Sequence, residues 1–323
     1  MGGIIDRHTL DVTDESIALG PFFRFMMTNA LGRRLQPLVF ESRALHRAVE
    51  RYADSAHSRR LIARFAARAG IDMSEMIVPP GGFKSFNDFF TRRLKPELRP
   101  FDRDPNVFAS PADSKLQVFP SLHEGARLDV KGVRFTLAEL LDDAELASAF
   151  EGGAAAIFRL YLADCHRLYF PCDGVPGVPR LVPGAYYSVS PLPGNDIALY
   201  SPQRCESQRL SCAAKMGRPT ERRLNPTFFT RNQRTVTTFD SARFGRLALV
   251  DVGGFLISSI ESVFNPGRTV KKGDEKSRFR FGGSTLVVLF PKNRIAFDDD
   301  LVRHAAAGYE VRVRIGERVG VSN

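Results

Sequence analysis

The sequence predicts an α+β fold, in which a helical N-terminal region (residues 1–100) precedes a mostly antiparallel β domain (residues 101–323). Apolar residues recur at helical spacing through the first seventy residues. Pro79-Pro80-Gly81-Gly82 then marks a break in the chain. After Pro100, short β-like runs alternate with Gly and Pro, as in an all-β region.

Two helical stretches are expected in the N-terminal region. Residues 22–40 are rich in Phe and Met and are interrupted by Gly32 and Pro37, residues that break helices. Residues 42–69 repeat apolar side chains at i, i+4 and i+7, the spacing of an apolar helix face. Gly70 follows as a predicted C-cap.

Five strands are expected in the β domain, at residues 155–162, 185–189, 247–252, 286–290 and 311–315. One helix is expected near residues 136–150. Thr136 and Glu139 stand there in the relation of a capping box, which satisfies free backbone groups at a helix start.

The composition is that of a globular protein with a basic surface. Of 323 residues, 43% are hydrophobic and 25% charged, which excludes disordered, collagen-like and coiled-coil chains. No apolar run is long enough for a membrane-spanning helix. The net charge of +10 favours an anionic partner, either nucleic acid or anionic lipid.

The cysteines and the N-terminal residues carry no further signal. Six residues separate the members of each pair, Cys165/Cys172 and Cys205/Cys212, so the spacing favours reduced thiols over zinc. We expect no metal site. The N-terminal residues show no targeting signal.

Residues 203–223 form a basic insertion with six basic and two acidic residues. A solvated loop is the simpler interpretation, and a loop that contacts phosphate is the alternative.

The segment FGGST, residues 281–285, has chemical potential beyond a turn. Gly282 and Gly283 could simply open the apolar strand that follows. Alternatively, Gly283 lets the Ser284 hydroxyl approach the preceding carbonyl, because no Cβ stands in the way. That arrangement suits attack by a serine on its own peptide bond.

Several further segments, in the same order, make the chain resemble the phosphatidylserine decarboxylase family over roughly residues 80–320. They are KSFNDFFTRRLKPELRP (84–100), SPADSK (110–115), KGVRFTLAELL (131–141), LADCHRLYFPCDG (162–174), YYSVSPL (186–192) and KKGDEKSRFRFGGST (271–285).

The resemblance implies a proenzyme that cuts itself between Gly283 and Ser284. Ser284 would attack the Gly283 carbonyl, giving an ester by N-to-O acyl shift. β-Elimination would leave dehydroalanine, which hydrolyses to a covalent pyruvoyl group and ammonia. The products would be a β chain of residues 1–283 and an α chain of residues 284–323.

The resemblance also implies the catalytic residues. Asp113 in SPADSK corresponds to the family's charge-relay aspartate; from the residues alone, it would cap a turn. His166 matches the first histidine of the family's Asp-Tyr-His-Arg-x-His, and Asp164 is available to orient it. The second histidine is replaced by Tyr169, a poor base because its ordinary pKa is about 10. Either His166 serves both steps or processing is slow.

A second departure lies at residues 250–261, VDVGGFLISSIE. The family commonly shows Val-Gly-Ala-Thr-x-Val-Gly-Ser-Ile there, and Phe255 is the bulkiest change. This departure bears on the efficiency and the substrate of the enzyme more than on its fold.

The leading functional expectation is a peripheral membrane enzyme that converts phosphatidylserine to phosphatidylethanolamine. Its partners would be phosphatidylserine and an anionic membrane surface, on the cytoplasmic face or on an organelle, with a homodimer left open. Residues 22–40 would form an interfacial helix; a buried core helix is the alternative. Nucleic acid is not an expected partner, because no nucleic-acid-binding motif is present.

Two other functions remain open. One is a pyruvoyl-dependent decarboxylase of a soluble amino acid. The other, motivated by Tyr169, is a family member that no longer processes itself and acts as a lipid-binding protein.

Overall fold

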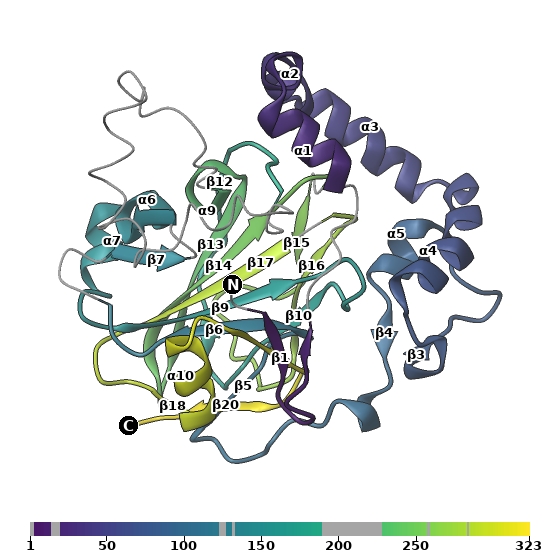
Figure 1. The fold of residues 1–323 in the computed structure, drawn as a ribbon. Helices are drawn as coiled ribbons and strands as arrows, with labels where there is room; N and C mark the ends of the chain where they lie inside the picture. The colour runs from purple at the N-terminus through teal and green to yellow at the C-terminus, as the bar shows by residue number, and fades with distance from the viewer. Residues whose placement is uncertain are drawn as a thin grey trace.

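The computed structural model describes residues 3–13, 20–122, 127–130, 133–188, 228–256, 259–282 and 284–323. Its centre is a ten-stranded sheet in the order β11-β13-β14-β17-β9-β6-β19-β1-β2, with β12 also paired to β13 (Figure 1). The strands are β1 (Ile4–Asp6), β2 (Val12–Thr13), β6 (Ser114–Phe119), β9 (Ala154–Leu160), β11 (Val175–Pro176), β12 (Arg180–Val182), β13 (Arg234–Ser241), β14 (Gly245–Gly253), β17 (Ser284–Phe290) and β19 (Glu310–Val313). All of its pairs are antiparallel except β1 with β19, so the predicted α+β class with a mostly antiparallel sheet is confirmed.

Four smaller sheets surround the large one. They comprise β10 (Arg167–Tyr169), β16 (Glu275–Phe279) and β15 (Ile260–Ser262); β18 (Ala296–Phe297), β20 (Arg318–Val321) and β5 (Val107–Ala109); β3 (Met76–Ile77) and β4 (Arg93–Leu94); and β7 (Arg127–Val130) and β8 (Val133–Thr136).

The centre of the large sheet is buried on both faces. In β17, Leu286 and Val288 pack into one core, which the two three-stranded sheets and α10 (Asp299–Ala306) cover. Val287 and Leu289 face a second core beneath α6 (Leu137–Leu141), α7 (Ala144–Ser148) and α9 (Phe228–Arg231). A strand buried on both faces has a continuous apolar sequence, which is why STLVVLF does not alternate.

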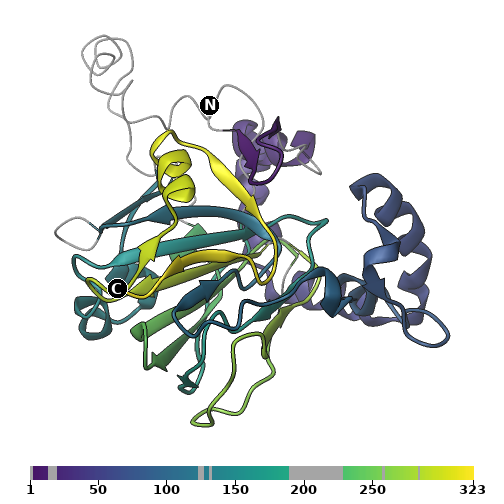
Figure 2. The same ribbon diagram turned by 90° about the horizontal axis from the view of Figure 1, so that it is seen from below.

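The N-terminal helices lie outside the sheet. They are α1 (Gly20–Thr28), α2 (Ala30–Phe40), α3 (Arg43–Asp54), α4 (Ile62–Ala69) and α5 (Phe86–Phe90), with 3₁₀ turns at Ala56–Leu61, Met73–Glu75 and Pro96–Leu98. Helices α3, α4 and α5 project to one side of the β body (Figure 2).

The break within residues 22–40 is not where the sequence placed it. It falls at Asn29, whose side chain accepts a hydrogen bond from the Leu31 N–H and caps α2. Gly32 and Pro37 lie inside α2. Gly32 is needed for packing, since a Cβ there would lie 2.2 Å from the Phe25 carbonyl oxygen, so α1 and α2 approach closely at this glycine.

Other local predictions had mixed outcomes. The capping box of Thr136 and Glu139 is present, and Gly70 ends α4 with a φ of 64°. The expected helix near residues 136–150 is two short helices, separated at Asp142. The strand expected at residues 185–189 is wrong for its described part, where Ala185 makes a single bridge to Asn232.

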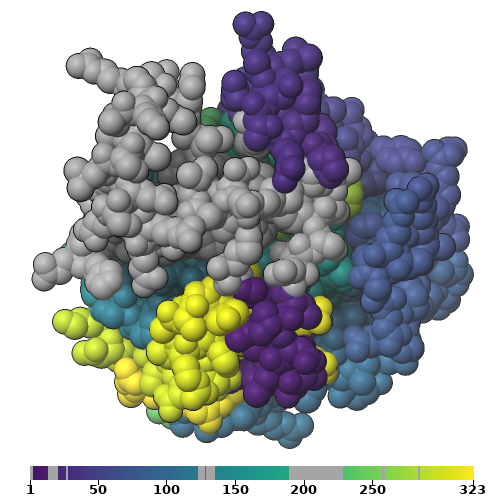
Figure 3. Space-filling view, viewed as in Figure 1, coloured from purple at the N-terminus to yellow at the C-terminus, as the bar shows by residue number. Residues whose placement is uncertain are grey.

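The residues after position 283 are interwoven with the rest of the chain. They supply β17, between β14 and β9, and β19, between β6 and β1. Figure 3 shows the yellow C-terminal residues directly against the purple N-terminal strand segment. A cut before Ser284 would therefore leave two pieces held together by a shared sheet.

Candidate active site

Ser284 is the first residue of β17 and is fully buried. It is paired with Gly253 of β14 on one side and Leu160 of β9 on the other. Among the described residues its Oγ has no hydrogen-bond partner. A buried hydroxyl without a partner is destabilising, which makes Ser284 a candidate for a chemical role.

The segment before Ser284 has an unusual backbone. Gly282 has a φ of 142°, a conformation that residues with a Cβ rarely adopt. Gly283, which the sequence predicts to precede the cleavage point, lies outside the described residues.

His166 is fully buried just before β10. Its Nδ1 lies 3.0 Å from the Asp164 carbonyl oxygen, which can only accept, so Nδ1 carries the proton of the neutral ring. Nε2 is left as a free base, with no hydrogen-bond partner in the described part of the chain. Burial lowers the pKa of His166 to about 3, with the Asp164 and Gly282 backbones partly opposing this shift. The imidazole thus lies near Gly282 and is neutral at physiological pH.

Asp164 orients His166 through its backbone rather than its side chain. Its carboxylate accepts hydrogen bonds of 2.6 Å from the Lys115 ammonium and from the Tyr161 N–H. The carboxylate therefore fixes the loop that carries His166, and Lys115 compensates its charge.

Asp113 lies in a different environment from His166. Its carboxylate accepts two hydrogen bonds of 2.9 Å from the Arg99 guanidinium and one of 2.8 Å from the Ile315 N–H. Within the described residues it makes no hydrogen bond to His166 or Ser284. The structure does not bring Asp113 into a hydrogen-bonded triad with them.

Tyr169 lies beside the Asp113 segment, since its N–H donates to the Pro111 carbonyl at 3.0 Å. Its ring centroid is 6.0 Å from that of Phe101. Burial raises the pKa of the Tyr169 phenol above its ordinary value, with the neighbouring Cys165 thiol and Glu275 carboxylate adding to the shift. Little of Tyr169 is therefore ionised at neutral pH, and the phenolate that could accept a proton is scarcer here than in water.

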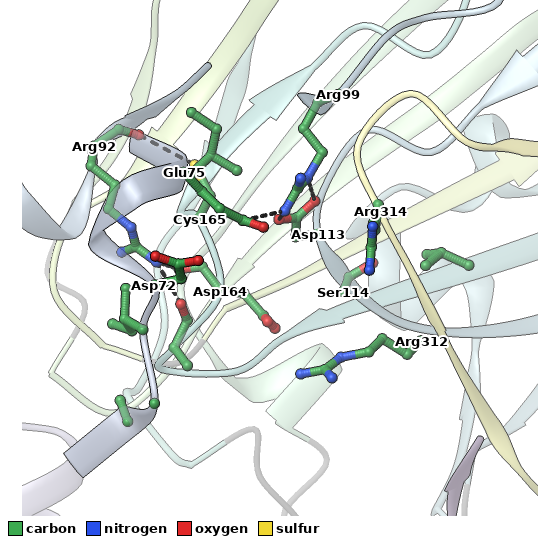
Figure 4. A pocket seen from close by; sticks show the side chains of 16 residues that line it. Asp72, Glu75, Arg92, Arg99, Asp113, Ser114, Asp164, Cys165, Arg312 and Arg314 are labelled. Carbon is green, nitrogen blue, oxygen red and sulfur yellow. Dashed lines mark hydrogen bonds and ion pairs between the residues drawn. The ribbon is translucent and has the colours of Figure 1, made fainter. Parts of the chain in front are cut away.

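A cavity of about 240 Å³ lies beside Asp113 and Asp164 (Figure 4). Asp113 and Asp164, which belong to separate sequence motifs, both line it, together with Arg92, Arg99 and Cys165. Cys165 and Cys172 are buried free thiols. Burial raises the pKa of Cys165 to about 11, so its thiol is protonated.

Phe255, the bulkiest departure from the family pattern, contacts the N-terminal helices. Its ring centroid lies 5.2 Å from that of Phe23 and 5.4 Å from that of Phe40. This side chain therefore connects α1 and α2 to the end of β14, two residues beyond Gly253.

Helix α5, whose residues were not expected to take part in the site, contacts both His166 and Phe281. The Phe90 ring centroid lies 3.9 Å from that of His166, and Asn87 hydrogen-bonds the backbone of Phe281. The Arg92 guanidinium donates at 2.5 Å to the Ala163 carbonyl, in the loop before His166. The motif KSFNDFFTRRLKPELRP was the available signal, because it contains all three residues.

Comparison with known proteins identifies the family to which the chain is similar. A family model of phosphatidylserine decarboxylases matches residues 86–321. The chain is 35% identical to a phosphatidylserine decarboxylase proenzyme of Chlamydia muridarum (strain MoPn / Nigg), covering 98% of this chain and 96% of that protein. It is 32% identical to the proenzyme of Clostridium novyi (strain NT), over 95% and 94% of the two chains. The chain belongs to the phosphatidylserine decarboxylase family.

The low pKa of His166 predicts how self-cleavage depends on pH. A histidine with an ordinary pKa of about 6.5 loses its basic form about 30-fold between pH 8 and pH 5. Because the pKa of His166 is about 3, we expect a nearly constant rate of chain cleavage over that range, measured on denaturing gels. A rate that falls with a midpoint near pH 6.5 would contradict this, and His166→Ala, which should stop cleavage, is the control.

Replacing Tyr169 tests whether that position still takes part in self-cleavage. An imidazole can accept a proton at neutral pH, and general-base catalysis contributes about 10²–10⁴-fold. We therefore expect Tyr169→His to accelerate cleavage and to make His166→Ala partly tolerable. Tyr169→Phe, which removes only the hydroxyl, should leave the natural rate unchanged. Equal cleavage rates in the natural protein and in Tyr169→His would show that the side chain at position 169 has a packing role only and takes no part in self-cleavage.

Proposed function

We propose that this protein is a proenzyme that cleaves itself between Gly283 and Ser284 and then decarboxylates phosphatidylserine to phosphatidylethanolamine. The observation that carries the proposal is the buried, unpartnered Ser284 hydroxyl at the start of a central strand. The related Chlamydia and Clostridium proteins are named phosphatidylserine decarboxylase proenzymes, which supports both parts of the proposal.

The surroundings of Ser284 fit a pyruvoyl group formed from this residue. No competing hydrogen bond within the described residues holds the hydroxyl, and the opposite residue on β14 is Gly253, which has no side chain. Once bound to the substrate amine, the group supplies the electron sink that decarboxylation needs.

The chain's own residues support the steps around that group. His166 Nε2 is the base proposed to take the Ser284 proton, since the buried ring is neutral and its Nδ1 is occupied. The fully buried start of β17 excludes water. After cleavage, β17 and β19 of the α chain stay paired with β9, β14 and β6 of the β chain.

The membrane surface is the proposed location of the substrate. On α1 and α2, Phe25, Leu31 and Leu38 are exposed, the last by 65% of its surface. Arg33 and Arg34 are also exposed on α2. Apolar side chains beside cations suit the interface of an anionic bilayer. No helix in the described part of the chain is long and apolar enough to cross a membrane.

Tyr169 supports a second candidate function, an uncut lipid-binding protein. A phenol with a raised pKa stands where the family has a base, so the proposed processing rests on His166 alone. This candidate would bind the same membrane surface as the proposed enzyme, but it would neither cleave itself nor decarboxylate phosphatidylserine.

One experiment separates the candidates. We expect purified protein to release CO₂ from phosphatidylserine in vesicles and not from free serine, and Ser284→Ala to lose all activity and remain uncut. Ser148→Ala, at a serine on the surface helix α7, is the control that should retain both. Activity on free serine without lipid would indicate a soluble substrate, and an uncut, inactive natural chain would indicate the lipid-binding protein.

Membrane docking through α1 and α2 makes a separate prediction. Binding to vesicles that contain phosphatidylserine should weaken as salt rises from 0.1 M to 1 M, because the screening length falls from about 10 Å to about 3 Å. Leu31→Glu together with Leu38→Glu should weaken binding further, since both side chains are exposed on α2. Equally strong binding to phosphatidylcholine vesicles, or unchanged vesicle binding by the double variant, would show that another surface of the protein docks.

A further inference from the structure

Helix α5 connects α3 to the cleavage segment, the name used here for residues 280–282 before the proposed cleavage point. The connection runs through one amide side chain. Asn87 is 4% exposed. Its Oδ1 accepts a 2.8 Å hydrogen bond from the Phe281 N–H, three residues before Ser284. Its Nδ2 donates a 2.9 Å hydrogen bond to the Asp54 carboxylate at the end of α3.

The orientation of this amide is determined by its partners. The Asp54 carboxylate is acceptor-only, so it takes the Nδ2 side of the amide and turns Oδ1 toward Phe281. The other oxygen of Asp54 accepts a 2.8 Å hydrogen bond from the Arg280 guanidinium. Asp54 and Asn87 together therefore hold two consecutive residues of the cleavage segment.

The same helix also fixes the proposed base. The Phe281 ring packs edge-on against Phe86, with centroids 4.9 Å apart, and against Phe90 at 5.3 Å. On its other side Phe90 lies against His166 at 3.9 Å. One five-residue helix thus sets the cleavage segment and the imidazole relative to each other.

We infer that Asn87 is a positioning residue for the N-to-O acyl shift, an inference that rests on the proposed self-cleavage. In that step the Ser284 Oγ forms a bond to the Gly283 carbonyl carbon and the peptide C–N bond breaks. The proton moves from Oγ to the released nitrogen through His166. Attack requires the reacting atoms at close approach, and a misplacement of about 1 Å costs on the order of 10²-fold. Asn87 supplies this alignment without touching the reacting atoms.

The first test is Asn87→Leu, which keeps the size of the side chain and removes both hydrogen bonds. We expect self-cleavage of newly made protein to slow by about 10²-fold. Hydroxylamine separates this step from the later elimination, because it attacks the ester carbonyl of Gly283 and releases Ser284 with its hydroxyl restored. If the acyl shift is the slow step, hydroxylamine should not restore the cleavage rate of Asn87→Leu.

Thr91→Val is the matched control. The Thr91 hydroxyl donates a 2.8 Å hydrogen bond to the Asn87 carbonyl at the end of the same helix and does not contact the cleavage segment. Its loss should leave the cleavage rate unchanged. A purely structural role for Asn87 would lower the melting temperature and leave the cleavage rate as it was, which would overturn the inference.

An exchange of side chains keeps the test decisive if Asn87→Leu does not fold. Asn87→Asp places two carboxylates together and should slow cleavage. The double variant Asp54→Asn, Asn87→Asp restores a donor opposite an acceptor and should recover most of the rate. Failure to recover it in a folded protein would overturn the inference. If instead the natural chain stays uncut with and without hydroxylamine, the proposed self-cleavage itself is wrong.

Discussion

The structure depends on the burial of β17 between β14 and β9. Every residue of this strand is buried, and its two faces enter two separate cores. Because Ser284 opens the strand, the proposed cleavage point lies where backbone pairing fixes its position and where water is excluded. The α chain expected from cleavage would begin at this strand, so the cores that stabilise the proenzyme would also hold the processed enzyme together.

Burial also explains the chemistry available around Ser284. It keeps His166 unprotonated and therefore able to accept a proton, while the lowered pKa reduces the ring's affinity for that proton. The same sheet face contains a fully buried ion pair, Lys276 with Asp251, two positions along β14 from the partner of Ser284. Charged groups persist in such a core only when they are paired, as Lys276 and Asp251 are. The surroundings of Ser284 are otherwise mostly apolar.

Local sequence patterns predicted much of the fold. The site residues were predicted only from the resemblance to the family. The Gly70 cap and the Thr136–Glu139 box are short-range features, and the structure has both. Residues 42–69 are helical as expected, in α3, a 3₁₀ turn and α4, but Leu45, Tyr52 and Leu61 of the apolar face are exposed. The sequence placed the helix break at Gly32 and not at Asn29. Gly32 instead lies inside α2, because the close approach of α1 and α2 leaves no room for a Cβ there. The catalytic roles expected of Ser284, Asp113 and His166 came from motif matching, and they stay predictions. The Ile315 partner of Asp113 and the contact of α5 with Phe281 join segments far apart in the chain, which no local pattern contains.

Two departures from the family pattern have different structural meanings. Phe255 fills a cluster with α1 and α2 and so ties the proposed membrane-facing helices to the end of β14. Tyr169 stands beside the Asp113 segment, apart from the contacts that His166 makes with Asp164 and Phe90. The first change concerns how the helices dock, and the second concerns which side chain serves as the base.

If the protein processes itself as proposed, Ser284 becomes the N-terminal group of a separate α chain. The intact mass of the purified, denatured protein tests this most directly. We expect two chains, residues 1–283 and residues 284–323, with the shorter one lighter by one ammonia than a peptide that begins with serine. A single uncut chain, or a short chain with a free N-terminal serine, would contradict it.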